Sequence, residues 1–315
     1  MNICVIGAGI AGAACARALV AGGQTVTVID RGRVVGGRMA SRRLPADARP
    51  PRQTDLGASY FTAQDERFLK VVHEWQQRGA ARPWTDRFHT AGPTGLGEVK
   101  IGPVRWAAPG GLRSLVEDLA AGLALQRNRE VLQVRGTCVD GESYDAVVLA
   151  MPDPQALQLL DPASPAAAAL SGRDWSPSLA LAAGFAERTW PADFDGAFVN
   201  DSEILSWVAD DGRRRGDGAP VLVAHTLPAY AAPRLADPQA ALPEVLRTLR
   251  TLLDLPAPQW TFLQRWTYPQ PVGVREAPFW LADGVGLCGD GWGAAKVEAA
   301  WRSGTLLGEA LLAGG

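Results

Sequence analysis

The stretch NICVIGAGIAGAACARAL, from Asn2 to Leu19, decides the fold of this 315-residue chain. Its apolar run Ile3–Ile6 predicts a buried strand, and Ile10–Ala21 predicts a helix that a glycine pair ends. A further apolar run, Thr25–Ile29, predicts a second strand. Strand, helix and strand in this order form a βαβ unit, which builds a parallel sheet with helices on its faces.

Three glycines with the spacing G-x-G-x-x-G connect the first strand to the helix. We expect Gly7 to make the tight turn, Gly9 to let the backbone approach a pyrophosphate, and Gly12 to let the helix pack closely on the strand. The free N–H groups at the helix start would then face the anion. Asp30 closes the second strand, 18 residues after Gly12. An acid there hydrogen-bonds the adenosine ribose and disfavours NADP, so a dinucleotide site is predicted, with NAD and FAD both open.

Composition excludes several function classes. Lys plus Arg number 31 and Asp plus Glu 33, so the broad basic surface that binds nucleic acid is absent. The four cysteines form no Cys-x-x-Cys pair, which is typical of reduced thiols in a cytoplasmic protein. The uncharged N-terminal run ends at Arg17, short of the roughly 20 residues that span a bilayer. Only three histidines occur, at spacings that indicate no metal site.

The pair Gly36-Gly37 after the second strand favours FAD over NAD. An NAD-dependent dehydrogenase would normally continue into the next helix here, whereas the glycine pair turns Arg38 back toward the first loop. Its guanidinium could then donate to the phosphates. A basic surface turn is the alternative, because Arg31 and Arg33 lie close by.

A second strand–turn–helix stretch stands near the end of the chain. Ala282–Cys288 predicts a strand, Gly289 a turn, and Lys296–Leu312 a helix with an apolar face. Asp290 would lie at the carboxyl end of the strand, where its carboxylate can bind the ribityl chain that FAD has and NAD lacks. The helix N-terminus would then favour negative charge on the pyrimidine edge of the reduced flavin by roughly 0.3–1 kcal/mol.

The remaining segments predict an α/β fold in which a Rossmann-like FAD-binding domain carries an inserted, β-rich α+β substrate domain. A hairpin followed by a buried strand at Ala146–Ala150 continues the first domain. Leu242–Leu253 predicts an amphipathic helix of the second domain, and the charged run Asp210–Gly218 predicts a solvated loop. The expected FAD-binding domain comprises residues 1–60, 106–153 and 264–315, and the substrate domain comprises 61–105 and 154–263.

Five motifs together resemble the renalase-like FAD-dependent oxidoreductases of the flavin amine oxidase superfamily. They are Gly7-x-Gly9-x-x-Gly12 with Asp30, Gly36-Gly37-Arg38-Met39, DLGASYFTAQD (Asp55–Asp65), RWTYPQP (Arg265–Pro271) and CGDGWGAAKVEAAW (Cys288–Trp301). The resemblance implies non-covalent FAD and a small-molecule substrate, a 2- or 6-dihydro isomer of NAD(P). The dihydropyridine would give hydride directly to flavin N5, leaving NAD(P)+, and oxygen would take the electrons to give hydrogen peroxide.

This chemistry needs no catalytic side chain, because a dihydropyridine donates hydride without a general base. We expect Trp266, Tyr268 and Trp292 to form walls against the nicotinamide ring, and Trp207 and His225 to offer donors. The expected pocket is completed by Tyr60 and Lys296. The cofactor-binding residues expected from the motifs, with the backbone of Val131 against adenine, are Gly7, Gly9, Ile10, Ala11, Gly12, Asp30, Arg31, Gly37, Arg38, Met39, Gly57, Ala58, Ser59, Val131, Ala150, Gly289, Asp290, Val297, Glu298 and Ala300.

Four positions depart from the pattern of bacterial relatives. Ser59 stands where Gln is usual, Gln64 replaces Arg, Lys296 replaces Arg, and Trp292 follows a glycine as in the animal form. These departures put the choice of substrate in doubt. Two alternative functions also stay open. One is an amine oxidase or desaturase-like flavoenzyme, and the other is a non-catalytic flavin-binding protein. A monomer or weak dimer is expected.

Overall fold

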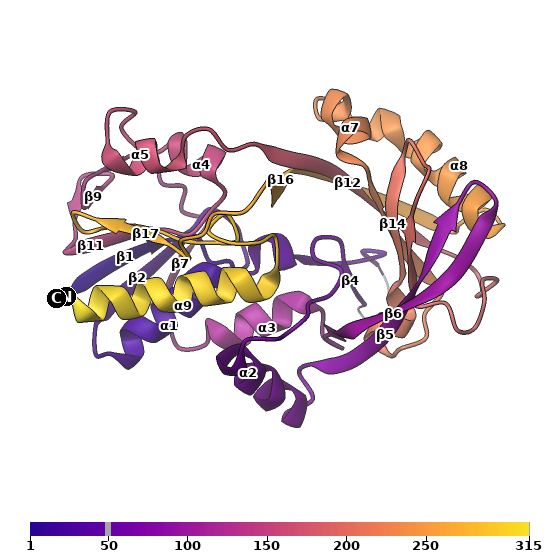
Figure 1. Ribbon diagram of the computed structural model, residues 1–315, viewed down its shortest axis with the longest axis horizontal. Coiled ribbons are helices and arrows are strands. Elements are labelled where there is room, and N and C mark those ends of the chain that lie inside the picture. Colours follow the sequence, from indigo (N-terminus) through magenta and orange to yellow (C-terminus); the bar gives the residue numbers. More distant parts are fainter. Residues whose placement is uncertain (48–51, 315) are drawn as a thin grey trace.

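Two β-sheets organise the chain, and long strands run from one toward the other. The computed structural model describes residues 1–47 and 52–314. Residues 48–51 and 315, which belong to the expected FAD-binding ranges, lie outside the described residues. In Figure 1 the first sheet lies on the left and the second on the right, and β12 and β16 reach across the top between them.

The first sheet has six strands in the order β17-β18-β11-β1-β2-β7, all parallel except the edge strand β17. Their bounds are β1 Asn2–Ile6, β2 Thr25–Asp30, β7 Ala124–Arg127, β11 Ala146–Leu149, β17 Trp280–Ala282 and β18 Val285–Leu287. Because β1 lies between β2 and β11, the turn that leaves β1 opens into the crevice where the strand order reverses, which is where such sheets bind ligands.

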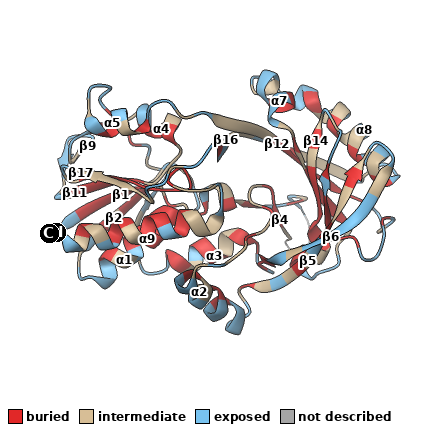
Figure 2. Cartoon of the chain, viewed as in Figure 1, coloured by how far each residue is buried: buried red, intermediate tan, exposed pale blue. Residues whose placement is uncertain are grey.

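Helices cover both faces of the first sheet, and Figure 2 shows the strands between them as buried. One face packs on α1 (Ile10–Ala21), α3 (Leu112–Leu119) and α9 (Val297–Ala313), with α2 (Glu66–Gln77) outside them. The other face packs on α4 (Asp153–Leu157) and α5 (Pro165–Leu170). Burial on both faces explains the continuous apolar runs of β1 and β11.

The second sheet has seven strands in the order β16-β12-β15-β14-β13-β5-β6, antiparallel except where β13 meets β5. Their bounds are β5 Arg82–Gly92, β6 Gly95–Ala107, β12 Trp175–Gly184, β13 Gly196–Val199, β14 Leu205–Asp210, β15 Val221–Thr226 and β16 Trp260–Pro271. The helices α7 (Pro228–Ala231) and α8 (Leu242–Leu253) cover its outer face with Val245, Leu249 and other apolar residues. The amphipathic helix expected at Leu242–Leu253 is confirmed.

Short elements complete the chain. The strands β3 (Ser41–Arg43) and β4 (Gln53–Asp55) pair with each other, and β8 (Val134–Arg135), β9 (Cys138–Val139) and β10 (Glu142–Ser143) form a small meander where a hairpin was expected. The helix α6 (Asp211–Arg215) follows β14 directly. The three segments of the opening βαβ unit agree with the prediction within one residue.

The last strand of the prediction is divided into two. Asp283 and Gly284 have positive φ, of 50° and 75°, and form the two-residue turn of an antiparallel hairpin between β17 and β18. Both central residues of a type I′ turn need positive φ, and Asp-Gly is a preferred pair for it. The prediction of one strand over Ala282–Cys288 was therefore wrong at this turn.

The packing also divides the chain differently from the expected domain ranges. α2, expected in the substrate domain, buries Phe68, Val72 and Trp75 against the core of the first sheet. The helices α4 and α5, also expected there, pack on the other face of the same sheet. The strand β16 crosses the expected boundary at residue 264 and pairs with β12 along its length.

Within the described part of the chain, no helix is both long enough and apolar enough to cross a membrane.

Candidate functional site

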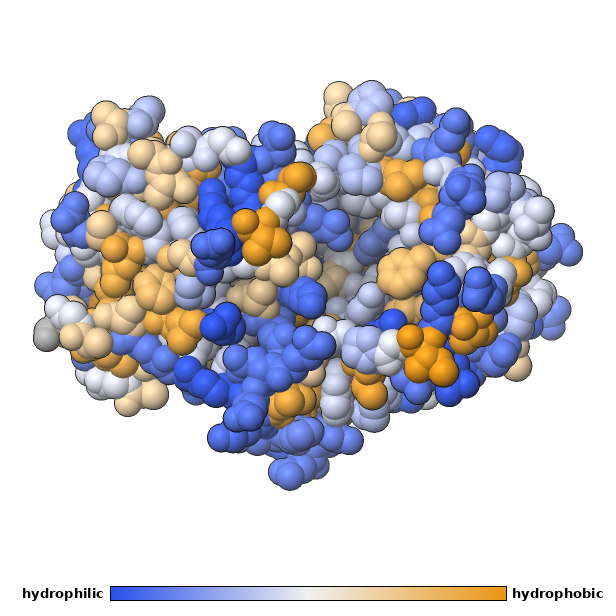
Figure 3. Space-filling view, in the orientation of Figure 1, coloured by the Kyte–Doolittle hydropathy of each residue, from blue (hydrophilic) through white to orange (hydrophobic). Residues whose placement is uncertain are grey.

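A cavity of about 1340 Å³ is lined by segments of both sheets. Ordinary small-molecule sites enclose roughly 300–1,000 Å³, so this cavity can accept an unusually large ligand or two ligands. Figure 3 shows the surface hollowed between the two halves of the molecule. The loops after β1 and β2 line one part of the cavity, and residues of the second sheet such as Phe198 and Trp207 line another.

The three glycines of the β1–α1 turn differ in whether neighbouring protein atoms leave room for a side chain. Gly7 has φ of +107°, and a Cβ there would lie 2.5 Å from the carbonyl oxygen of Ala150. A Cβ on Gly12 would lie 1.9 Å from the carbonyl oxygen of Gly7. Gly9 has an ordinary φ of −78°, and its Cβ would meet no protein atom within 4 Å. Because Gly9 lines the cavity, the space beside it is open to a ligand.

Asp30 holds this turn in place from the end of β2. One carboxylate oxygen accepts a hydrogen bond from the N–H of Ala8 at 2.7 Å, and the other accepts one from the N–H of Gly32 at 2.6 Å. Asp30 and Arg31 also line the cavity. Each carboxylate oxygen keeps capacity for a second donor, such as a ribose hydroxyl.

Several of the predicted cofactor residues that line the cavity beside the β1–α1 turn are apolar. Ile10 and Ala11 lie at the start of α1, and Val131 and Ala150 lie beside the first sheet. Val131 itself is buried, and its neighbours Arg129 and Glu130 also line the cavity. The start of α1 carries no acidic residue in its first turn and no side-chain cap, which leaves its N–H groups for an anion.

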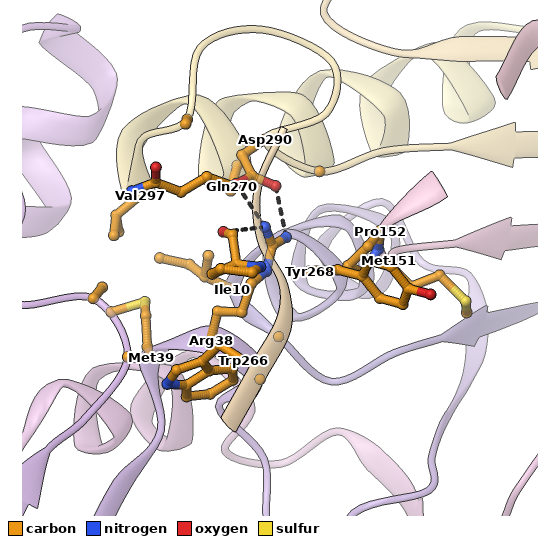
Figure 4. Close-up of a pocket in the computed structure, with 18 of the residues that line it drawn as sticks. Ile10, Arg38, Met39, Met151, Pro152, Trp266, Tyr268, Gln270, Asp290 and Val297 are labelled. Atoms are coloured by element: carbon orange, nitrogen blue, oxygen red, sulfur yellow. Dashed lines mark hydrogen bonds and ion pairs between the residues drawn. The ribbon is translucent and has the colours of Figure 1, made fainter. Parts of the chain in front are cut away.

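Arg38 and Asp290 join the two ends of the chain across the cavity. The two terminal nitrogens of Arg38 donate to the two carboxylate oxygens of Asp290 at 2.7 and 2.6 Å, and one also donates to the carbonyl of Pro269 at 3.1 Å. Figure 4 shows this bidentate pair in the middle of the site. Arg38 was expected to donate to phosphates and Asp290 to bind a ribityl chain. In the structure the two side chains hydrogen-bond to each other, and both line the cavity.

The helices α1 and α9 bring those ends together by close packing. Gly304 of α9 lies so near α1 that a Cβ would be 1.9 Å from the carbonyl oxygen of Ala11. One turn later, a Cβ on Gly308 would be 2.9 Å from the carbonyl oxygen of Cys15. The close approach directs the N-terminal residues of α9, Lys296, Val297 and Ala300, to the cavity.

The segment from Gly57 to Tyr60 lines the cavity and is held by bonds from several elements. A Cβ on Gly57 would lie 1.9 Å from the carbonyl oxygen of Arg38, so the segment passes directly against the Gly37–Met39 turn, which also lines the cavity. The indole N–H of Trp207 donates to the hydroxyl of Ser59 at 3.0 Å. The segment, with Ala58, therefore forms a fixed floor between the two sheets.

Only the end of the charged run Asp210–Gly218, Gly216–Gly218, is exposed; its first part is largely buried, and there the prediction of a solvated loop was wrong. That part forms α6, and both Asp211 and Arg214 are fully buried. Arg214 pairs with Asp211 and donates to the carbonyls of Ser59 at 2.8 Å and Asp55 at 3.1 Å. Charges at i and i+3 meet on a helix face, and the cavity floor supplies the remaining acceptors.

Trp266 and Tyr268, two of the aromatic residues of β16, point to different sides. In Figure 4 the ring of Trp266 lies below Arg38 near Met39, whereas the ring of Tyr268 points away from it, toward Met151 and Pro152. Trp266 also donates its indole N–H to the carbonyl of Leu56 at 2.7 Å. Both rings line the cavity, but they do not face each other as two walls around one ring.

Trp292 and Glu298 do not line the cavity, contrary to expectation. Trp292 is buried in the core beside β18, with the guanidinium of Arg275 4.4 Å above its ring. The carboxylate of Glu298 accepts the backbone N–H groups of Gln64 and Asp65, each at 2.6 Å. The tight turn after Asp290 directs the indole inward, and Glu298 fastens α9 to the segment that follows the cavity floor.

On the second sheet, His225 lines the cavity beside Trp207. Its Nε2 is buried without a hydrogen-bond partner among the described residues. Burial, and next the positive charge of Arg214, lower the pKa of His225 to about 4, so the imidazole is neutral near pH 7. It can donate or accept one hydrogen bond to a ligand.

Arg105 was not predicted as a site residue, although it also lines the cavity. The hydroxyl residues Ser178, Ser206 and Thr226 line it as well and were likewise missed. Single arginines and serines give no local signal, because only the pairing of distant strands brings them to one surface. Within the described residues, no cluster of His, Cys, Asp and Glu could hold a metal ion.

Two family models match the chain. One, described as an NAD(P)-binding Rossmann-like domain, matches residues 5–75, and the other, described as a flavin containing amine oxidoreductase, matches residues 87–310.

Solved structures share the fold at low identity. Putrescine oxidase bound to putrescine has a TM-score of 0.75 and 14% identity, covering 99% of each chain. Cyclohexylamine oxidase from Brevibacterium oxydans IH-35A has a TM-score of 0.76 and 13% identity, again over 99% of each chain. An oxidoreductase from Methanosarcina mazei has a TM-score of 0.72 and 15% identity over 98% of this chain and 100% of that one.

The cavity fits the flavin that this family contains. The open space at Gly9 lies where a side chain would fill a pyrophosphate cradle, and the N–H groups of α1 are free to bind it. Asp30 and Asp290 line the cavity with carboxylates that can accept from sugar hydroxyls. A flavin held by a dinucleotide-binding turn is FAD, and the cofactor predicted from the sequence agrees with the family.

Proposed function

The chain belongs to the flavin containing amine oxidoreductase family, and on that premise we propose that it is an oxidase of dihydronicotinamide isomers. The substrates are 2- or 6-dihydro forms of NAD(P), the products are NAD(P)+ and hydrogen peroxide, and oxygen is the electron acceptor. FAD, bound without a covalent link, supplies the hydride acceptor.

One observation carries the proposal: no carboxylate of the second sheet lines the cavity within the described part of the chain. The three carboxylates that line it are Asp30, Glu130 and Asp290, and Asp290 is paired with Arg38. Arg105 and Arg265 face it from the second sheet. An alkylamine is a cation at neutral pH, with a pKa near 10.4 for a lysine-like group, and finds no counter-ion there. A dihydropyridine nucleotide has a neutral ring and anionic phosphates.

The chain's own residues also suit a substrate that needs no deprotonation. The imidazole of His225 has a pKa of about 4 and is a weak base. Its unpartnered Nε2 can instead bind the carboxamide of the nicotinamide. The Trp207 and Tyr60 rings, with centroids 5.7 Å apart, give an apolar surface beside it. These residues orient a ring and exclude water, which is the protein's part in hydride chemistry.

We assign the site accordingly. The substrate is held by Tyr60, Trp207, His225, Trp266, Tyr268 and Lys296, and Trp292 has a structural role instead. The cofactor residues remain those predicted from the motifs, except that Gly12 acts by helix packing and Glu298 fastens α9 to the segment that follows the cavity floor.

Amine oxidation is the second candidate, because Tyr60, Trp207 and Phe198 line the cavity with aromatic rings that can enclose a neutral amine. A third possibility is flavin binding without turnover.

Anaerobic mixing separates these functions. Purified protein is mixed with 2- and 6-dihydro-NAD(P), with putrescine or with cyclohexylamine, and the flavin absorbance is followed before and after air is admitted. We expect prompt bleaching with at least one dihydropyridine, none with the amines, and recovery in air with one equivalent of hydrogen peroxide. Bleaching by amines alone would contradict the proposal, and bleaching by no compound would favour a binding protein.

A further inference from the structure

Arg105 stands apart from the other buried arginines of the chain. It lies on β6, is only 8% exposed, and lines the cavity. Among the described residues it forms no ion pair with a carboxylate, although its charge contributes to lowering the pKa of Asp86, and its Nη1 is buried without a hydrogen-bond partner. Its guanidinium lies 4.3 Å from the ring centroid of Phe88.

Buried arginines are normally paired, and elsewhere this chain follows the rule. Arg214 and Arg215 share the carboxylate of Asp211, and Arg215 also contacts Asp55 at 2.9 Å. At Arg105 the Phe88 ring compensates part of the desolvation through a cation–π contact, but it leaves the in-plane N–H donors available. A buried guanidinium that has no carboxylate partner and faces a cavity is therefore a site for an anion that comes with the ligand.

Tyr60 adds a second donor beside it. Burial raises the pKa of the Tyr60 hydroxyl, and the positive charge of Arg105, together with a hydrogen bond that its guanidinium donates to the phenol oxygen, opposes that shift only in part. The hydroxyl therefore keeps its proton and can donate. Both residues belong to the part of the cavity formed with the second sheet, where Pro103 and Phe198 also line it, and not to the Gly9 turn that suits the FAD pyrophosphate.

We propose that Arg105 is the oxyanion-binding residue of the substrate pocket and takes a phosphate group of the substrate nucleotide. This inference rests on the proposed function, in which the substrate carries phosphates. The planar fork of the guanidinium matches two phosphate oxygens, and a charge-assisted bidentate contact fixes the orientation of the whole ligand. The hydroxyls of Ser178, Ser206 and Thr226, on the same sheet, suit the ribose between phosphate and ring.

The test compares ligands with and without the phosphate on the FAD-loaded protein. Isothermal titration calorimetry measures binding of nicotinamide mononucleotide, nicotinamide riboside and inorganic pyrophosphate. In the wild type, the mononucleotide should bind roughly 10- to 100-fold more tightly than the riboside, the range expected for charge-assisted hydrogen bonds. Arg105→Gln should abolish that difference and pyrophosphate binding, while riboside binding stays within about twofold.

Two variants serve as references. Arg87→Gln, on the neighbouring strand β5, removes an exposed arginine that pairs with Asp86 at 3.0 Å, and it should behave as the wild type. Arg105→Lys keeps the charge and loses the fork, so it should retain an intermediate preference for the phosphate. If Arg105→Gln does not fold, the wild-type preference for the mononucleotide over the riboside, and its change in Arg105→Lys, still test whether Arg105 binds the phosphate.

The outcomes separate this inference from the proposed function. Equal affinity for mononucleotide and riboside in the wild type, or an equal loss for both in Arg105→Gln, would overturn the phosphate assignment while dihydropyridine oxidation stands. Arg105-dependent binding of acetate without binding of pyrophosphate would also overturn it, in favour of a carboxylate. If no dihydropyridine bleaches the flavin but pyrophosphate binds through Arg105, the proposed function fails and the anion site remains.

Discussion

Gly9→Ala is the most specific test of whether the cavity binds a dinucleotide. The backbone at Gly9 has φ of −78° and ψ of −179°, which alanine adopts without strain, and its Cβ would meet no protein atom within 4 Å. The fold without cofactor should therefore tolerate the change, or gain about 0.4–1 kcal/mol from the loss of glycine entropy in the unfolded chain.

The cofactor should not tolerate it. A Cβ extends about 1.5 Å from Cα, which is enough to move a touching pyrophosphate beyond hydrogen-bond range of the N–H groups at the start of α1. Charge-assisted hydrogen bonds contribute about 1.5–3 kcal/mol each, so the loss of one or two should cost about 2–4 kcal/mol. FAD should then bind roughly 30- to 900-fold more weakly.

The assay is an FAD titration of flavin-free protein, followed by thermal unfolding of that protein. Gly12→Ala is the matched control, because its Cβ would lie 1.9 Å from the carbonyl oxygen of Gly7 and should destabilise the flavin-free fold itself by about 1–3 kcal/mol. Unchanged FAD affinity in Gly9→Ala, or a melting temperature as low as that of Gly12→Ala, would refute the reasoning.

Three further changes test other parts of the site. Gly304→Ala should push α9 away from α1, because its Cβ would lie 1.9 Å from the carbonyl oxygen of Ala11. We expect the free energy of unfolding to fall by about 1–3 kcal/mol and FAD to bind more weakly. Melting and titration curves like those of the wild type would contradict this. Asp290→Asn removes the negative charge and one of the two oxygens that accept from Arg38, and it should weaken FAD binding roughly 10- to 100-fold in the same titration; unchanged affinity would count against its role. Burial, and secondarily Arg214, lower the pKa of His225 to about 4, so between pH 6.5 and 4 the unfolded chain binds a proton that the folded chain does not. Stability should fall by up to about 3 kcal/mol as pH decreases through that window, and denaturant titrations should show a smaller fall for His225→Asn.

The first half of the site could be predicted because its rules are local. A turn with Gly7 at φ of +107° and Gly12 against the carbonyl of Gly7 needs glycine at those positions whatever the rest of the chain does. The same holds for α1, whose bounds Ile10–Ala21 agree with the prediction. The turn at Asp283-Gly284, which was missed, could also have been predicted from the sequence, because Asp-Gly between apolar residues indicates a hairpin.

The second half could not be predicted in this way. Asp211 and Arg214 form a charged stretch that is solvated in most proteins, and partners distant in the sequence explain their burial: the carbonyls of Ser59 and Asp55 for Arg214, and the guanidinium of Arg52 for Asp211. Trp292 and Tyr268 are aromatic residues in the expected motifs, yet Trp292 packs in the core beside β18, whereas Tyr268 points toward Met151 and Pro152 (Figure 4). Such directions follow from long-range packing rather than from spacing.

The cofactor residues and the substrate residues are positioned by different parts of the fold. The residues that hold the nucleotide lie on turns whose glycines are visible in the sequence, whereas substrate residues such as Trp207 and His225 meet because β14 and β15 pair in a particular register. A shift of β14 by one residue in that register would turn Trp207 to the outer face of the sheet, away from His225. The cofactor can therefore stay constant while the substrate changes through the second sheet, and the unpaired charge of Arg105 is the feature there that most directly restricts which substrates fit.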